Sequence, residues 1–214
     1  MAERLRFSAR AAYRHLREAD PVIGRLIDEK GPYAPRPSTD PYASLVRTIL
    51  FQQLAGAAAS AIQRRLYAMH GTEDRTPSPK QLLETTDEAY RSVGVSRQKA
   101  GYLRDLAQHV VDGELDFDHI DGWSDDEVSA HLTAVKGIGE WSAHMFLMFQ
   151  LGRPDVLPVG DLGVRIGMGI AYGLDETPTA KEALVIGEPW HPYASVASWY
   201  MWRAAETFTP GDSL

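Results

Sequence analysis

The chain has 214 residues, a formal net charge of −7 and no cysteine. This length allows a sizeable core, built as one domain or two small lobes, and the absence of cysteine excludes disulfides, thiolate zinc sites, iron–sulfur clusters and thiol nucleophiles. The negative charge argues mildly against a nucleic-acid partner, because phosphate neutralisation drives much of that affinity, but a small basic footprint on an acidic protein is compatible with DNA binding.

The first segment of the chain, MAERLRFSARAAYRHL, is rich in arginine. It has no apolar stretch typical of an export signal, and no run in the sequence approaches the roughly 18 apolar residues of a membrane-spanning helix. We therefore expect an intracellular protein that does not bind membranes, cytoplasmic or nucleoid-associated in a bacterium and nuclear otherwise.

Helix signals dominate the rest of the chain, and strand-like alternation is scarce. Asp20-Pro21 begins a short helix, residues 31–41 form a linker-like stretch, and Asp40-Pro41 is an N-cap followed by proline at the first helical position. Further helices are expected at about 41–52, 57–70, 96–111, after a capping box at Ser124-Asp-Asp-Glu127, and at about 140–151, 162–172 and 193–207. The pattern predicts an all-α fold.

A glycine-containing turn separates two of these expected helices. Gly137 and Gly139 flank one apolar residue in VKGIGEWSA, and glycine permits tight turns and the close approach of another backbone. The amides that begin the second helix lie at the positive end of its dipole, which suits a phosphate. From the GxG pair alone, a purely structural helix turn remains an alternative interpretation.

Asp161 follows in LPVGDLGVR, at the start of the next expected helix. Taken alone, an aspartate at this position is a helix N-cap. A carboxylate held there can also stabilise the positive charge that develops on a sugar when an N-glycosidic bond breaks. Asp155, the nearest other carboxylate, is expected to cap a helix or face solvent.

Three segments in this order resemble the helix-hairpin-helix (HhH-GPD) DNA glycosylase superfamily, and within it the alkylation-repair branch of 3-methyladenine DNA glycosylase II type. They are DPYASLVRTILFQQLAGAAASAI, VKGIGEWSAHMFLMFQLGRPDVLPVGDLGVR and PWHPYASVASWYMWRAA. The likeness covers about Pro21 to Glu206. It implies a single glycosylase unit over residues 1–214, with one lobe at about 40–130, a second at 1–39 plus 131–214, a cleft between them, and the hairpin at about 125–151.

The resemblance assigns roles to residues of the base pocket. It places the catalytic carboxylate at Asp161, the base-stacking tryptophan at Trp202, and the opposite wall, often aromatic, at Met145. Trp141 stands where members that also nick the strand carry a Schiff-base lysine, so the implied enzyme leaves an abasic site. From the residues alone, packing behind the hairpin is as good a role for Trp141, and aromatic residues at helical spacing are more often core.

The resemblance also implies how DNA is held. Gly137, Gly139 and the neighbouring Lys136 would bind a phosphate. The turn containing Gln52, Gln53 and Leu54 would enter the minor groove and fill the gap left by a flipped nucleotide, with Gln53 the first choice for the wedge and Gln52 the second. The turn departs from the usual pattern at Phe51 and at Ala55-Gly56, and Ala194 stands where an arginine is frequent.

A structural Na⁺ or K⁺ is implied at the main-chain carbonyls of Thr133, Val135 and Ile138. The seven histidines show no metal-binding spacing, and we expect no organic cofactor and no catalytic metal.

The implied function is release of an alkylated purine, of the 3-methyladenine or 7-methylguanine class, from damaged double-stranded DNA by a monomeric enzyme. Three alternatives remain open at this point. The enzyme could act on hypoxanthine, ethenoadenine or a base methylated on its Watson–Crick edge. The chain could be a DNA-structure-binding module without chemistry, or a helical scaffold with no DNA role.

Overall fold

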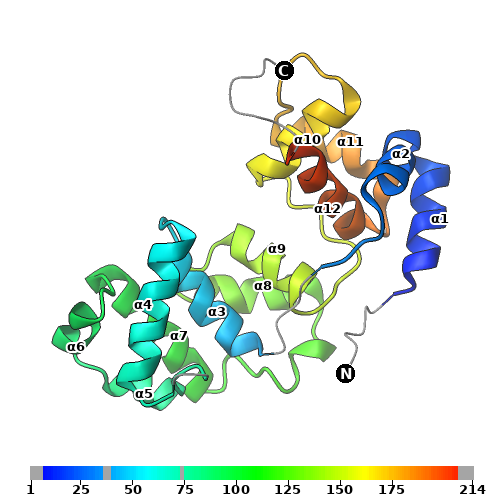
Figure 1. Ribbon diagram of the computed structural model, residues 1–214. Coiled ribbons are helices and arrows are strands. Elements are labelled where there is room, and N and C mark those ends of the chain that lie inside the picture. The colour runs from blue at the N-terminus through cyan, green and yellow to red at the C-terminus, as the bar shows by residue number, and fades with distance from the viewer. Residues whose placement is uncertain (1–6, 36–39, 73–74, 207–214) are drawn as a thin grey trace. The chain divides into compact units, whose positions relative to one another are not determined.

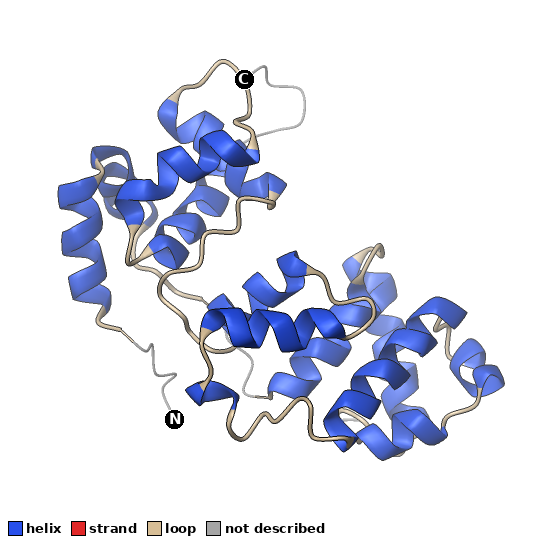
Figure 2. Ribbon diagram, turned by 180° about the vertical axis from the view of Figure 1, so that it is seen from behind, coloured by secondary structure: helices blue, strands red, loops and turns tan. Residues whose placement is uncertain are grey.

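The computed structural model describes residues 7–35, 40–72 and 75–206. Within these ranges the chain forms helices joined by loops and turns, and it contains no strand (Figures 1 and 2). The all-α fold class expected from the sequence is therefore confirmed. None of the described helices is long and apolar enough to cross a membrane.

The chain divides into two compact units. Unit 1 comprises Met1–Pro37 and Leu147–Leu214, and unit 2 comprises Ser38–Phe146. This division differs from the lobes expected from the sequence, which placed residues 131–146 with the chain ends. The difference arises because the glycine turn packs within unit 2, where Val135 and Ile138 are buried and Gln52 donates a hydrogen bond to the carbonyl of Gly137.

Unit 1 is built from both parts of its divided chain. Its helices are α1 (Ala9–Ala19), α2 (Pro21–Lys30), α10 (Leu162–Tyr172), α11 (Ala180–Gly187) and α12 (Ala194–Ala205), with a 3-10 turn η2 (Glu188–Trp190). Its core includes Leu16, Ile23, Val164, Met168, Trp190, Tyr200 and Met201. The early helices thus share one hydrophobic core with the last helix.

Helices α10 and α12 pack very closely. A Cβ atom built on Gly167 of α10 would lie 2.0 Å from the carbonyl oxygen of Met201 in α12, which no side chain permits. Glycine at this position therefore lets the two backbones touch. The close crossing fixes α10 against α12, and these two helices carry Asp161 and Trp202.

A buried aspartate connects α2 to the rest of unit 1. Asp20, only 6% exposed, caps α2 by accepting hydrogen bonds from the amides of Val22 and Ile23. Its other oxygen accepts from the hydroxyl of Tyr172 and from the indole Nε1 of Trp190, the latter at 2.9 Å. Burial, followed by the hydrogen bond to Asp20, raises the pKa of Tyr172. The hydroxyl of Tyr172 therefore remains a donor to Asp20.

Unit 2 is formed by a continuous stretch of chain. Its helices are α3 (Pro41–Phe51), α4 (Gly56–Met69), α5 (Pro79–Glu84), α6 (Asp87–Ser92), α7 (Arg97–Val111), the 3-10 turn η1 (Ile120–Gly122), α8 (Asp125–Ala134) and most of α9 (Glu140–Phe149). Leucine and isoleucine side chains fill its interior, among them Leu45, Ile49, Leu50, Leu66, Leu82, Leu103 and Leu106. The expected caps are present, with Asp40 accepting from the amide of Ala43 and a reciprocal capping box at Ser124 and Glu127.

The expected helices of the longer segments match the structure to within about two residues, except where an expectation falls on residues outside the described ranges. Residues 36–39 of the expected linker and Thr207 of the expected last helix lie outside them. Helices α1, α5, α6 and α11 had no counterpart in the sequence-based expectation.

Candidate active site and nucleic-acid interface

Asp161 occupies the N-cap position of α10. Its Oδ1 atom accepts a hydrogen bond from the amide of Val164 at 2.8 Å, so the expected capping role is confirmed. The same oxygen accepts a second hydrogen bond, from the indole Nε1 of Trp202 at 2.9 Å. Two donors from different helices therefore fix the orientation of this carboxylate.

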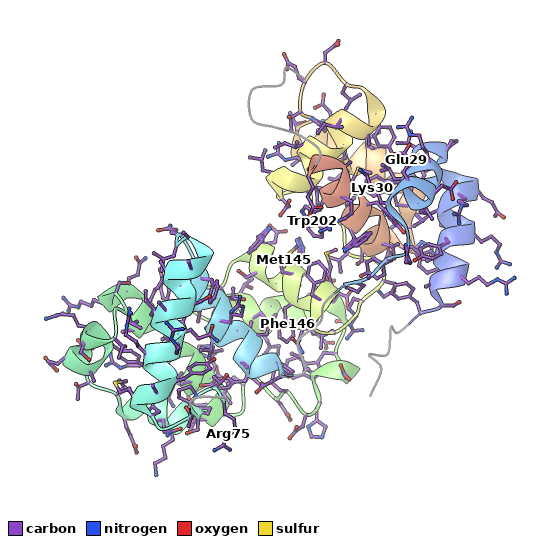
Figure 3. The ribbon with its side chains drawn as sticks, viewed as in Figure 1. Glu29, Lys30, Arg75, Met145, Phe146 and Trp202 are labelled. Carbon is purple, nitrogen blue, oxygen red and sulfur yellow. The ribbon has the colours of Figure 1, made fainter. Side chains whose placement is uncertain are left out.

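Trp202, labelled in Figure 3, is partly buried, and its indole ring lies close to Gly163 of α10. A Cβ atom on Gly163 would lie 3.0 Å from the Cδ1 atom of Trp202, so the glycine leaves the room that the indole needs to reach Asp161. The ring of Phe149 packs on the indole at a centroid distance of 5.7 Å and an angle of 36°. Sequence reasoning did not single out Gly163 or Phe149.

The other aromatic residues near the end of the chain have structural roles. Trp190 and Tyr200 are completely buried, and Trp199 packs edge-on against Tyr33 at a centroid distance of 5.6 Å. These residues form the core, as aromatic residues at helical spacing usually do. Trp202 differs from them because it remains partly accessible and contacts Asp161.

Two further predicted pocket residues, Trp141 and Met145, lie on α9 in unit 2. Trp141 is 51% exposed, so its side chain is not packed away behind the hairpin. Met145 is partly exposed, and the next residue, Phe146, is buried. Figure 3 shows both side chains on this helix. Asp161 and Trp202 meet in unit 1, whereas Trp141 and Met145 are described within unit 2.

The two glycines of the turn differ in what they require. Gly137 has a φ angle of +85°, and a Cβ atom on it would lie 2.3 Å from the ring of Tyr102. Glycine at 137 is thus demanded by the fold itself. Gly139 has no positive φ, and a Cβ atom on it would meet no described atom within 4 Å. Its carbonyl accepts from the amide of Ala143 in the first turn of α9.

Lys136 is held by an acidic partner. Its backbone amide and its Nζ atom each donate to Asp105 of α7, both at 2.8 Å. Burial acts to raise the pKa of Asp105, but the hydrogen bonds and charge of Lys136 outweigh it and hold that pKa below its ordinary value. The hydrogen bond to Asp105 in turn raises the pKa of Lys136. Much of the positive charge expected to attract a phosphate is therefore offset.

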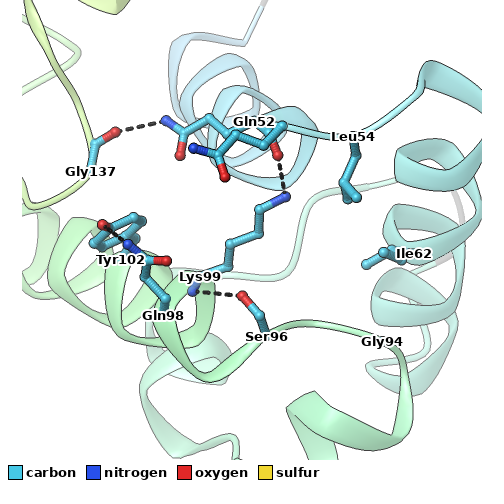
Figure 4. A pocket seen from close by; sticks show the side chains of 10 residues that line it. Gln52, Leu54, Ile62, Gly94, Ser96, Gln98, Lys99, Tyr102 and Gly137 are labelled. Atoms are coloured by element: carbon cyan, nitrogen blue, oxygen red, sulfur yellow. Dashed lines mark hydrogen bonds between the residues drawn. The ribbon is translucent and has the colours of Figure 1, made fainter.

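The polar turn after α3 has separate tasks for its two glutamines. Gln52 is half-buried, and its Nε2 atom donates to the carbonyl of Gly137 at 2.7 Å (Figure 4). Gln53 is exposed and has a φ angle of +56°, and the exposed Leu54 follows it. Geometry thus favours Gln53, with Leu54, at the tip of the turn, and makes Gln52 a connection to the hairpin.

A pocket of about 440 Å³ lies beneath this turn (Figure 4). Its lining includes Gln52, Gln53, Lys99, Tyr102 and Gly137. Lys99, on α7, donates from Nζ to the carbonyls of Leu50 at 2.6 Å and Gln52 at 2.8 Å. Burial lowers the pKa of Lys99. Sequence reasoning did not single out this lysine.

The three carbonyls expected to hold a monovalent cation lie at the end of α8 and in the turn that follows it. The helix ends at Ala134, and Val135 has extended backbone angles, so the carbonyls of Thr133, Val135 and Ile138 come from the last helical turn and the hairpin. Carbonyl oxygens at a helix C-terminus carry partial negative charge and lack most intrahelical donors. Across residues 7–35, 40–72 and 75–206, no group of three or more His, Asp or Glu side chains is placed to hold a metal ion.

Asp155 contacts the start of α12, although Tyr193 occupies the N-cap position of that helix. One carboxylate oxygen accepts a hydrogen bond from the amide of Ala194 at the start of α12, and His191 Nδ1 lies 2.8 Å from the same oxygen. This carboxylate therefore anchors the helix that carries Trp202, rather than facing the Asp161 carboxylate.

A protein family and individual relatives match this chain. Residues 46–192 match the family described as HhH-GPD superfamily base excision DNA repair protein. The chain is 32% identical to a Schizosaccharomyces pombe protein named DNA-3-methyladenine glycosylase 1, over 90% of this chain and 86% of that relative.

Solved structures show the same fold. A Bacillus halodurans structure described as DNA-3-methyladenine glycosidase is 40% identical with a TM-score of 0.85, covering 94% of this chain and 91% of that one. The Schizosaccharomyces pombe 3-methyladenine DNA glycosylase Mag1, solved in complex with abasic DNA, is 31% identical with a TM-score of 0.80, covering 93% and 99%. The chain belongs to the HhH-GPD superfamily of base excision DNA repair proteins.

Proposed function

We propose that this protein is a DNA glycosylase that flips alkylated purines, of the 3-methyladenine or 7-methylguanine class, out of duplex DNA and hydrolyses their N-glycosidic bonds. The observation that carries the proposal is the Asp161–Trp202 pair, a doubly held carboxylate beside a partly accessible indole. The relatives named for 3-methyladenine repair support the same substrate class.

Asp161 supplies the electrostatic part of the chemistry. As the bond between C1′ and the base nitrogen breaks, its electron pair leaves with the base, and positive charge develops on the deoxyribose. A carboxylate beside the sugar stabilises that charge, and a water molecule then adds to C1′ and gives up a proton. A base alkylated on a ring nitrogen is cationic, so it accepts the electron pair readily and leaves as a neutral molecule.

Trp202 supplies a surface for that base. An electron-poor cationic ring is attracted to the face of an indole by stacking and cation–π forces. Because the indole N–H is bonded to Asp161, a base stacked on Trp202 would bring its sugar close to the carboxylate. Met145 and the exposed Trp141 remain our candidates for further contacts with the base.

The glycine turn is assigned to binding the DNA backbone, and the polar turn to opening the base stack. We assign the amides around Gly137 and Gly139, with Lys136, to a phosphate, since phosphate contacts position a protein without reading sequence. Gln53 and Leu54, exposed at the tip of their turn, would fill the gap left by the flipped nucleotide. A Na⁺ or K⁺ at the carbonyls of Thr133, Val135 and Ile138 would support the hairpin.

The enzyme is proposed to act as a monomer, without an organic cofactor or a catalytic metal, and to leave the DNA strand intact. The last point rests on Trp141, which occupies the position of the Schiff-base lysine in strand-nicking members. Product DNA should therefore stay full length until hot alkali cleaves the abasic sites.

The proposal is tested by incubating the protein with DNA treated with a methylating agent and identifying the bases released. We expect 3-methyladenine and 7-methylguanine in the supernatant, and loss of release in Asp161→Asn. Asp175→Asn is the matched control, because Asp175 is an exposed carboxylate beyond the other end of α10.

The other outcomes separate the alternatives. Tight binding to abasic DNA without release of any base would identify a binding module. Release of hypoxanthine or ethenoadenine alone would move the enzyme to another lesion class. A covalent adduct trapped by borohydride would overturn the assignment as a hydrolase that leaves the strand intact.

A further inference from the structure

One face of α7 holds both of the turns assigned to DNA. Lys99, Tyr102 and Asp105 follow one another at three-residue spacing, which places them along one side of a helix. Lys99 binds the carbonyls that end α3, whereas Tyr102 lies under Gly137 and Asp105 binds Lys136. The polar turn at residues 52–55 and the glycine turn at residues 135–139 therefore rest on the same helix.

The contact of Lys99 with α3 is suited to hold the polar turn in place. The carbonyls of Leu50 and Gln52 lie at the C-terminal end of α3, where the helix dipole favours a cation. The next residue, Gln53, adopts a left-handed conformation that is unfavourable for a residue with a side chain. A turn in such a conformation needs support from its surroundings, and Lys99 provides two hydrogen bonds directly before it.

Gln52 connects the two turns to each other. Its main-chain carbonyl accepts from Lys99, while its side-chain amide donates to the carbonyl of Gly137 at 2.7 Å (Figure 4). Lys99, Gln52 and Gly137 thus form a continuous chain of hydrogen bonds within unit 2. Displacement of either turn would break a bond in this chain.

We propose that α7 is a rigid mount that fixes the polar turn relative to the glycine turn, with Lys99 and Gln52 as positioning residues for base flipping. The inference rests on the proposed function. Flipping a base requires unstacking it, and the turn that enters the duplex must keep its position while the stack opens. Through α7, residues 52–55 are held at a fixed position relative to the turn that binds a phosphate. The bound DNA backbone therefore keeps the wedge in place while the base is unstacked.

The test compares variants that remove the hydrogen bonds with little change of side-chain length. Lys99→Met and Gln52→Met remove the donors. Gln98→Met is the matched control, because Gln98 lines the same pocket but donates to the hydroxyl of Tyr102 rather than to either turn. Lys99→Arg serves as rescue, because a guanidinium can still donate to two carbonyls.

Each protein is assayed under single-turnover conditions on two duplexes that contain 7-methylguanine, either paired with cytosine or mispaired with thymine. A mispaired base costs less to unstack, so it depends less on the wedge. We expect Lys99→Met and Gln52→Met to lower the rate constant on the order of 10-fold on the paired duplex and clearly less on the mispaired one. Affinity for undamaged DNA should not change, and Lys99→Arg and Gln98→Met should behave as the wild type.

A second readout needs no bond cleavage. The fluorescence of 2-aminopurine placed beside an abasic-site analogue rises when the neighbouring stack is opened, and this rise should be smaller for Lys99→Met and Gln52→Met than for the wild type. The proposed role of α7 would be overturned if the rate constants fell equally on both duplexes, or if rates and fluorescence did not change. A wild-type protein that releases no base would refute the proposed function, while the fluorescence still decides the mount. If circular dichroism shows that Lys99→Met is unfolded, the comparison rests on Gln52→Met.

Discussion

A single oxygen of Asp161 links two helices at the site where we place the chemistry. It accepts a hydrogen bond from the amide of Val164 in the first turn of α10 and another from the indole N–H of Trp202. Hydrogen bonds to a charged acceptor are short and directional, so they restrict the rotation of the carboxylate. The protein itself therefore fixes the orientation of this carboxylate, which is a condition for effective electrostatic stabilisation of a developing charge.

Replacing the charge while keeping the shape gives the most direct test at this residue. Asp161→Asn should lower the single-turnover rate of base release by roughly 10²–10³, since one preorganised electrostatic contact is worth about 3–4 kcal/mol in a transition state. The affinity for alkylated duplex DNA, measured by fluorescence anisotropy, should stay the same or rise, because a negative charge near phosphates is lost. Wild-type rates in this variant would remove Asp161 from the chemistry.

The two contributions of Trp202 can be separated by substitution. Trp202→Phe keeps an aromatic face but loses the bond to Asp161, so it should slow release of cationic 7-methylguanine and neutral hypoxanthine by a similar factor, on the order of 10-fold. Trp202→Ala also loses the stacking surface, worth about 1–3 kcal/mol per base. It should therefore slow release of the cationic base more than that of the neutral one.

Equal declines for both lesions in Trp202→Ala, together with a large drop in the melting temperature, would instead make Trp202 a core residue. Circular dichroism melting of the two variants serves as the control for folding.

The motifs nominated the residues of the proposed site, but they did not predict the contacts between these residues. Asp161 was expected as an N-cap from its position before an apolar helix, and this depends only on local sequence. The bond from Trp202 joins residues 41 positions apart and depends on how α12 crosses α10. Likewise, the sequence gives no sign of which adjacent glutamine turns outward, because that follows from the bond between Gln52 and Gly137.

At the scale of elements, the crossing of α10 and α12 sets the distance between Asp161 and Trp202. Gly167→Ala would force a methyl group into the backbone of Met201. We therefore expect the free energy of unfolding to fall by about 1–3 kcal/mol. Gly163→Ala meets mainly the movable indole of Trp202 and an oxygen of Asp161. It should leave the melting temperature nearly unchanged but lower the rate of base release about 10-fold, through the weakened bond between them.

Melting curves and single-turnover rates of the two variants check this prediction. A Gly163→Ala protein with full activity would show that the bond between Trp202 and Asp161 contributes little to the chemistry.

The glycine turn offers a second matched pair. Gly137→Ala should disturb the fold of the hairpin, because the residue has a positive φ and lies against the ring of Tyr102. Gly139→Ala should leave the fold intact, since the added methyl group meets no described atom within 4 Å. If DNA approaches the backbone at this point, Gly139→Ala should weaken binding to duplexes of every sequence alike.

Affinity titrations on damaged and undamaged duplexes, with circular dichroism as the folding control, measure the effect. A folded Gly139→Ala variant with unchanged affinity on both duplexes would mean that the turn is purely structural.

Local signals predicted the longer helices well because their caps and apolar spacing act over a few residues. Helices α5 and α6 have six residues each, too few to show a helical period, although Ser78 and Thr86 cap them in the ordinary way. The division into units could not be predicted in the same manner. It depends on the contacts of residues 135–139 with α7 and with Gln52, which join distant parts of the sequence.

At the scale of the whole molecule, the negative net charge should set a modest dependence of DNA binding on salt. The charge of −7 opposes association, and the ammonium of Lys136 is already paired with Asp105. With few phosphates neutralised, a plot of log affinity against log salt concentration should have a slope of roughly −2 to −4. Anisotropy titrations from low to physiological salt measure it, and a slope steeper than about −6 would reveal a basic surface much larger than the hairpin.

The divided make-up of unit 1 has a consequence for how the protein is made. Unit 2 leaves the ribosome as one uninterrupted stretch, so its core can close while synthesis continues. Helices α1 and α2 end at Lys30, but they share their core with α12, which begins only at Ala194. Leu16 and Ile23 therefore cannot be buried against α12 until almost all of the described chain has been translated. The early folding of unit 2 shortens the effective loop between the two halves of unit 1, which lowers the entropy cost of bringing them together.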